Sequence, residues 1–175
     1  MAPRNSRRQF LMDSTKAGLG LYLGSGLLAS CTTAAKLPQS SVTTGFQQQP
    51  LPYDYNALSA AIDATTMEIH YSKHAASYAT NLNEAAKAEN IDTSKPVEDV
   101  LRRISKYSTK VRNNGGGHYN HELFWKCMTP SGPERPSGTL ATPIDSSFGS
   151  FDAFKKQLTD AGTGRFGSGW AWLVV

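Results

Sequence analysis

The stretch NNGGGHYNHELFW, at Asn113–Trp125, is the most informative part of this 175-residue chain for predicting its fold. It joins a run of glycines to two histidines and a group of aromatic side chains. A second stretch, TMEIHYSKHAASY at Thr66–Tyr78, holds the other two histidines of the chain. Because all four histidines fall within these two stretches, the sequence predicts that they contribute to a single site.

Both stretches have the spacing of helices. His70, His74 and Tyr78 follow one another at i, i+4 and i+8, which places them on one helix face. His118 and His121, spaced i and i+3, also lie close in angle. Two such helices packed antiparallel would bring several imidazoles together, and imidazole binds zinc, iron, manganese and copper alike. The pattern therefore predicts a metal site between two helices, with the alternative that some of these histidines serve only in core packing.

Residues 50–130 are predicted to form a long antiparallel helical hairpin. Its first helix should run over Leu58–Glu89, where apolar residues recur at helical spacing and neither Pro nor Gly occurs. The alternative is a helix that is broken near Ala64–Thr66. The glycine run within Asn113–Gly117 should interrupt the second helix, which would resume over His118–Met128.

Residues 139–175 are predicted to begin a second domain, after the Pro- and Gly-rich loop Thr129–Gly138. A helix is expected within Ser147–Gly162, with Ser150 as its N-cap. The aromatic and β-branched stretch Gly167–Val175 is typical of a strand, whose unpaired edge should promote association. The expected fold class is therefore α+β, a helical hairpin followed by an incomplete α/β domain of one helix and one strand.

Residues 1–30 read as an export signal rather than as part of the fold. The twin-arginine pattern SRRQFL at Ser6–Leu11 precedes an apolar stretch that is too short and glycine-rich for a membrane span. LASC at Leu28–Cys31 resembles a bacterial lipobox, so Cys31 is the predicted lipidation site. The alternative is a plain amphipathic N-terminal helix. Residues 31–49 are predicted to be a flexible tether, and the protein is expected to be lipid-anchored in the periplasm or cell envelope.

The charge of the chain argues against a nucleic-acid partner. The formal net charge is +4, but the four basic residues and one acidic residue of positions 1–30 account for three of these charges. The remainder is nearly neutral and has no basic stripe, so no phosphate backbone is expected to bind. The only membrane contact expected is through the lipidated N-terminus.

Five motifs of this chain resemble, in sequence and in order, those of the iron/manganese superoxide dismutases: LPYDYNAL, TMEIHYSKHAASY, NNGGGHYNHELFW, FGSFDAFKKQ and GSGWAWL. The resemblance covers essentially Leu51–Val175. It implies that His70 is the first metal ligand and His121 the second. It also implies that His74 and Tyr78 form the catalytic pair that relays protons at the mouth of the substrate funnel.

The resemblance assigns roles to further residues. Trp125 and Trp170 would line the metal pocket, Lys73 would attract the anionic substrate, and His118 would be structural rather than a ligand. The implied reaction converts superoxide to O₂ and H₂O₂ at one manganese or iron ion per subunit, in a homodimer. Many iron-type members have a glutamine four residues before the second ligand, where this chain has Gly117, so the resemblance favours manganese.

The sequence departs from the family pattern in one respect. The Asp-x-Trp-Glu-His segment that supplies the family's two remaining ligands does not occur in the 175 residues. We therefore expect a truncated chain with little or no dismutase activity of its own. A second hypothesis is a non-enzymatic exported lipoprotein that keeps the helical half as a binding module. A third is an unrelated helical zinc protein that uses all four histidines as ligands.

Overall fold

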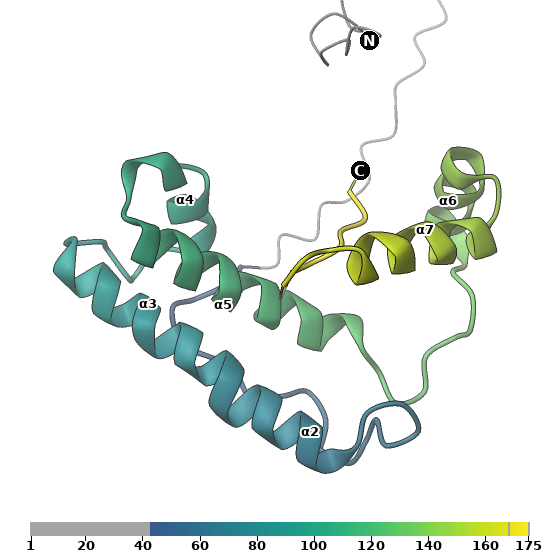
Figure 1. Cartoon of the computed structure of the whole chain (residues 1–175), viewed down its shortest axis with the longest axis horizontal. Helices are drawn as coiled ribbons and strands as arrows, with labels where there is room; N and C mark the ends of the chain where they lie inside the picture. The colour runs from purple at the N-terminus through teal and green to yellow at the C-terminus, as the bar shows by residue number, and fades with distance from the viewer. Residues whose placement is uncertain (1–42, 168, 175) are drawn as a thin grey trace, which may run out of the picture. The chain divides into compact units, whose positions relative to one another are not determined.

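A computed structural model of the chain describes residues 43–167 and 169–174, and within these ranges the regular structure is helical throughout (Figure 1). The predicted signal of residues 1–30 and the lipidation site Cys31 lie outside the described residues. Within the described part, no helix is both long and apolar enough to cross a membrane.

The first arm of the hairpin is a continuous helical rod of three segments. These are α2 (Ala64–Ile69), the π-helical turn η1 (His70–Ala75) and α3 (Ala76–Ala88). The predicted helix start at Leu58 is wrong. Residues 58–61 form turns, and the rod begins at Ala64 with Asp63 as its N-cap. The Asp63 carboxylate accepts hydrogen bonds from the Thr66 amide at 2.9 Å and from the Thr66 hydroxyl at 2.7 Å.

The second arm is α5 (Thr109–Cys127), which runs antiparallel beside α3 (Figure 1). Its N-cap is Ser108, whose hydroxyl accepts a hydrogen bond from the Val111 amide at 3.2 Å. The predicted helix break at Asn113–Gly117 is wrong, since α5 passes through the glycines without interruption. A Cβ at Gly115 would touch Leu82, and one at Gly117 would overlap the ring of Tyr78. These glycines therefore serve the close approach of the two arms and not a break.

The hairpin core lies between α3, α5 and the short helix α4 (Val97–Leu101), which is followed by the 3₁₀ turn η2 (Ile104–Lys106). Its buried apolar residues are Phe46, Leu82, Ala85, Ala86, Val97, Val100 and Val111. A second cluster near the other end of the rod consists of Met67, Ala75 and Trp125.

The predicted tether of residues 31–49 is wrong for its last part. Phe46 is 3% exposed and belongs to the core, and Thr44 is equally buried. The Thr44 carbonyl accepts a hydrogen bond from the Val97 amide at 2.9 Å. Since these residues are built into the fold, the folded part begins before the predicted start at Pro50.

The C-terminal part consists of the 3₁₀ turn η3 (Gly138–Leu140), α6 (Ala141–Phe148) and α7 (Phe151–Thr163). Gly149 separates the two helices with a φ of 84°, which only glycine adopts readily. Ser150 is the N-cap of α7, as predicted, and its hydroxyl accepts a hydrogen bond from the Ala153 amide at 3.1 Å. Phe148 and Phe154 pack across the junction with ring centroids 5.1 Å apart.

The predicted strand over Gly167–Val175 is not found, because residues 169–174 have no regular structure. A strand is stabilised by hydrogen bonds to a neighbouring strand, and the described ranges contain no strand with which this segment could pair. The α+β class is therefore corrected to a helical hairpin with a helical C-terminal part, as far as the structure describes the chain.

Candidate metal centre

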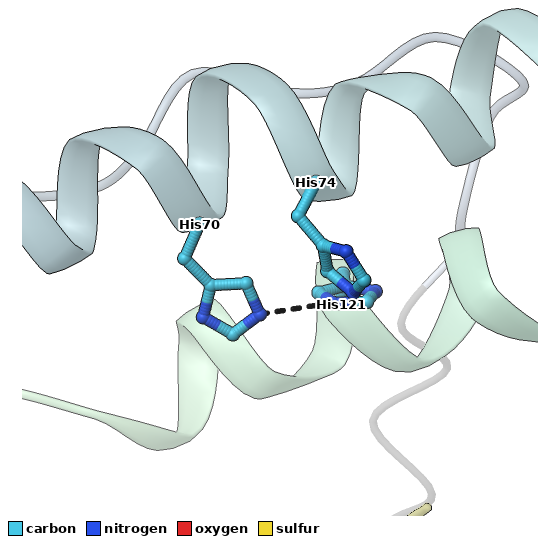
Figure 2. A group of neighbouring side chains, drawn as sticks. All are labelled: His70, His74 and His121. Carbon is cyan, nitrogen blue, oxygen red and sulfur yellow. Dashed lines mark hydrogen bonds between the residues drawn. The ribbon is translucent and has the colours of Figure 1, made fainter. Parts of the chain in front are cut away.

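Three imidazoles converge between the two arms of the hairpin (Figure 2). His70 and His74 come from η1, and His121 comes from α5. The Nε2 atoms of His70 and His121 lie 3.2 Å apart, and one ring nitrogen from each of the three residues lies within 4.8 Å of the others. The i, i+4 spacing that predicted a shared face for His70 and His74 is thus confirmed by the geometry.

The orientation of His121 is set by the backbone of its own helix. Its Nδ1 lies 2.7 Å from the Gly117 carbonyl oxygen. A carbonyl only accepts hydrogen bonds, so Nδ1 carries the proton and the lone pair of Nε2 points toward His70. This is the arrangement in which an imidazole coordinates a metal while its other nitrogen is held by the surrounding protein.

The electrostatic environment keeps both facing imidazoles neutral. Burial, together with the nearby His70, His74 and His118, lowers the pKa of His121 to about 4, although the Gly117 carbonyl opposes this shift. The pKa of His70 is also lowered, first by burial and then by His74. Neutral imidazoles have free lone pairs near pH 7, so the pair can bind a cation without first losing protons.

The π-helical turn η1 carries two of the three imidazoles. Single π-helical turns within α-helices are rare, and a large share of those known lie at functional sites. The rings of His70 and His74 have centroids 5.3 Å apart, and each lies 5.1–5.2 Å from that of His121. The turn therefore presents both rings of the first arm to the single ring of the second.

Aromatic side chains enclose the imidazoles. Trp125 meets the His70 ring edge-on at 5.1 Å, and Trp170 meets the His121 ring in the same way at 5.0 Å. Tyr78 stacks on His121 with centroids 5.3 Å apart and planes inclined by 30°. A cavity of about 510 Å³ opens over the centre, and its lining includes His70, His74, Tyr78, His121, Phe124, Leu158 and Trp170.

The residues predicted from the sequence fall into two groups. His70, His74, Tyr78, His121, Trp125 and Trp170 meet at this centre. Lys73 is exposed and does not line the cavity, although it precedes His74 directly. Trp172, which was not predicted for the site, stacks on Tyr119 with ring centroids 6.1 Å apart.

His118 does not reach the centre. It is 1% exposed, and its Nε2 lies 2.8 Å from the Gly45 carbonyl oxygen, to which it donates a hydrogen bond. A site that uses all four histidines is therefore contradicted, and the hypothesis of a four-histidine zinc protein is wrong on this point.

Sequence reasoning missed several residues of the site. Phe124 follows His121 by three residues in the quoted motif, so helical spacing could have placed it at the centre. Leu158, on α7, carries no such signal. Glu122 is only 2% exposed, whereas a charged residue beside a histidine pattern would be expected at the surface. Burial, then the neighbouring carboxylate of Glu122, then Tyr55 raise the pKa of Tyr71, which places Tyr71 near Glu122.

The donor set fits a divalent transition-metal ion. Metal–imidazole bonds of about 2.0–2.1 Å allow two nitrogens at the observed 3.2 Å separation to share one ion. The buried Trp125 indole Nε1 has no hydrogen-bond partner among the described residues, which leaves a donor free beside the imidazoles. Both observations are consistent with a centre that receives further groups.

Two patterns of one protein family together match nearly all of the described residues. The pattern of the iron/manganese superoxide dismutases, alpha-hairpin domain, matches residues 45–129. The pattern of the C-terminal domain of the same enzymes matches residues 136–175.

Individual relatives agree with these matches. A manganese superoxide dismutase of Leptolyngbya boryana is 48% identical, over 78% of this chain and 56% of its own length. One of Acinetobacter baylyi is 47% identical, over 81% of this chain and 63% of its own. An iron superoxide dismutase of Raoultella planticola is 48% identical, over 74% of this chain and 78% of its own. The chain thus spans somewhat more than half the length of the two manganese relatives.

Proposed function

The chain belongs to the iron/manganese superoxide dismutase family, and from that premise we propose that its imidazole centre holds a manganese or iron ion and serves superoxide dismutation. The observation that carries this proposal is the facing pair of Nε2 atoms, 3.2 Å apart, at the base of an aromatic-lined cavity. The reaction consumes two superoxide ions and two protons and yields O₂ and H₂O₂.

The proposed ligands from this chain are His70 and His121. Each is held neutral by its surroundings, and His121 is oriented by the Gly117 carbonyl. When bound, a manganese or iron ion would supply one-electron redox chemistry, accepting an electron from one superoxide and returning an electron to a second. The part of the protein is to fix two nitrogen ligands and leave the cavity side of the centre accessible.

Proton delivery is assigned to His74 and Tyr78. Both line the cavity, and their rings meet edge-on with centroids 5.2 Å apart. An imidazole and a phenol can each donate and accept a proton, and both lie next to the His121 ring. Trp125 and Trp170 would exclude bulk water from the imidazoles, and the exposed charge of Lys73 would attract the anion.

We propose manganese rather than iron as the metal. The position that carries a glutamine in many iron-type members is Gly117, against which the Tyr78 ring packs too closely for a Cβ. A glutamine there would displace Tyr78 from its stacked position on His121. Relatives of both metal types are similar to this chain, so the metal content of the purified protein is the deciding measurement.

The test of the proposed function begins with the gene. Sequencing the coding DNA beyond the codon for Val175 establishes whether an Asp-x-Trp-Glu-His segment follows, and hence which chain to assay. We expect the protein with that segment to bind manganese and to accelerate superoxide decay. His121→Ala should abolish both properties, while Cys127→Ala, an exposed position on the same helix, should leave both unchanged. Undiminished activity in His121→Ala would overturn the proposal.

We further propose export by the twin-arginine route, lipidation at Cys31 and assembly as a homodimer. The support is the order of SRRQFL and LASC in residues 1–31 and the resemblance to a dimeric family. Labelling of cells with radioactive palmitate should mark the protein, and Cys31→Ser should lose the label. Sedimentation of the purified protein decides the oligomeric state. An unlabelled parent protein would overturn the lipidation.

A further inference from the structure

We propose that residues 44–49, which we name the strap, act together with Glu122 as a clamp that sets the separation of His70 and His121. Glu122 is then a positioning residue of the metal centre, acting through the helix segment that carries His121. The inference rests on the proposed function only in taking His70 and His121 as the metal ligands.

The strap is fastened at its beginning to the hairpin core. The Thr44 amide donates to both carboxylate oxygens of Glu98, at 2.9 and 3.2 Å. The Phe46 side chain is buried in the core, and the side-chain amide of Asn83 donates a hydrogen bond to the Phe46 carbonyl at 2.8 Å. Because these contacts are to residues of α3 and α4, the first half of the strap cannot shift without disturbing the core.

The second half of the strap reaches the residues directly after each proposed ligand. The Gln48 side-chain amide donates to the Tyr71 carbonyl at 3.0 Å, and the Tyr71 hydroxyl donates to the Gln49 carbonyl at 2.8 Å. The Gln49 amide donates to Oε1 of Glu122 at 3.2 Å. Tyr71 follows His70 and Glu122 follows His121, so Gln49 connects the two ligand-bearing segments.

The burial of Glu122 indicates that this connection is specific. Glutamate is almost never fully buried unless it is paired, yet Glu122 is 2% exposed on a helix whose glycines already allow close packing. Its hydrogen-bond partner is a backbone N–H group of the strap and not a cation. A side chain that served packing alone at this position would be apolar, so the carboxylate is best explained by the hydrogen bond that it accepts.

The consequence concerns the two facing Nε2 atoms. Metal sites require their ligands to be held within about 0.5 Å of the productive geometry, and supporting hydrogen bonds supply this precision. When the Gln49–Glu122 hydrogen bond is removed, α5 keeps the hydrogen bond from His118 to Gly45 at the first half of the strap. It loses the hydrogen bond to Gln49, the residue that also contacts the segment carrying His70. The hairpin core remains, but the 3.2 Å separation of the nitrogens is no longer imposed from this side.

The experiment uses the full 175-residue chain and Co²⁺ as a spectroscopic probe. Glu122→Ala and Gln49→Pro each remove the hydrogen bond, one from the acceptor and the other from the donor. Glu122→Gln keeps an oxygen acceptor, and Gln49→Ala keeps the backbone N–H. We expect the first two variants to weaken Co²⁺ binding about tenfold, the lower end of the effect of removing an outer-shell partner, and to change the visible absorption of bound Co²⁺. The two matched controls should stay close to the parent chain in both measurements.

Thermal unfolding of the metal-free variants separates positioning from simple stability. A lowered midpoint with unchanged Co²⁺ affinity and spectrum in Glu122→Ala would overturn the clamp. If Glu122→Ala does not fold, the Gln49 pair decides, because Gln49→Pro lacks the backbone N–H that Gln49→Ala keeps; proline also fixes the backbone φ at this position. Co²⁺ binding by the parent that His70→Ala and His121→Ala leave unchanged would instead overturn the proposed metal centre itself.

Discussion

The hairpin of α3 and α5 and the C-terminal pair α6 and α7 are both helical, but they are buried very differently. Both hydrophobic clusters of the described chain belong to the hairpin and the segments that precede it. Helix α6 contributes only Ile144 to the fully buried residues, and α7 contributes none. Several large apolar side chains near the end of the described residues are exposed: Phe166, Trp172, Leu173 and Val174.

The residues of the candidate metal centre are divided between the same two parts. All three imidazoles come from the well-buried hairpin, whereas the C-terminal part supplies Leu158 and Trp170 to the cavity wall. The position of the three imidazoles therefore depends on the packing of the hairpin, while the enclosure of the site depends on the C-terminal part. The two parts should therefore respond differently to mutation.

The largest expected difference is between two leucines, one in each part of the molecule. Leu82 on α3 is 0% exposed and lies against Gly115 of α5, so Leu82→Ala should destabilise the protein by about 3–5 kcal/mol. Leu158 on α7 is only partly buried, and Leu158→Ala should cost about 1 kcal/mol or less. Urea unfolding followed by circular dichroism measures both. Equal losses of stability would contradict the difference in burial, because α7 would then be as tightly packed as the hairpin.

A smaller effect is expected from the glycines of α5. Gly117→Ala should cost about 1–3 kcal/mol, because the added Cβ overlaps the Tyr78 ring. Gly116→Ala is the matched control: a Cβ there meets nothing within 4 Å, and alanine is favoured over glycine in a helix by about 1 kcal/mol. The two neighbouring substitutions should thus change the free energy of unfolding in opposite directions.

The same pair of variants sharpens the link to the metal centre. Displacement of Tyr78 also disturbs its stacking on His121, so Gly117→Ala should weaken Co²⁺ binding and Gly116→Ala should not. If both variants bind Co²⁺ like the parent, then the contact between the arms stabilises the hairpin without positioning the ligand.

The glycines of α5 also show which features of the fold can be predicted from local sequence and which cannot. The hairpin, the shared face of His70 and His74 and the Ser150 cap follow from periodicity and cap preferences, which depend on a few neighbouring residues. The expected break at Asn113–Gly117 failed because helix propensity is local, whereas the reason for Gly117 is a tyrosine 39 positions earlier in the chain. Tertiary contact overrode propensity at this point.

The other errors have the same origin. The strand expected over Gly167–Val175 depends on a neighbouring strand that local patterning cannot supply. Residues 43–49 have the polar composition of a linker, and only the burial of Phe46 and the hydrogen bonds of the strap reveal that they belong to the fold. The burial of Glu122 likewise could not be predicted, since the sequence shows a charged side chain but not its backbone partner.

A further effect is a pH dependence above about pH 4 that comes from the hairpin, since all four histidines lie between positions 70 and 121. The pKa of His121 is about 4 in the folded protein and near 6.5 in an unfolded chain. Between these values the unfolded state binds a proton that the folded state excludes, so stability is fully present above pH 6.5 and is lost as the pH falls toward 4. The slope from one such group is at most about 1.4 kcal/mol per pH unit.

Urea unfolding of the metal-free chain across this pH range should therefore show stability that falls toward acid. His121→Gln should reduce the slope without removing it, because the pKa of His70 is lowered in the same direction. Cys127→Ala, at the exposed end of the same helix, should keep the slope of the parent. An identical slope in His121→Gln would mean that His121 is not held neutral by burial, and the argument that the centre is ready to bind a cation near neutral pH would fail with it.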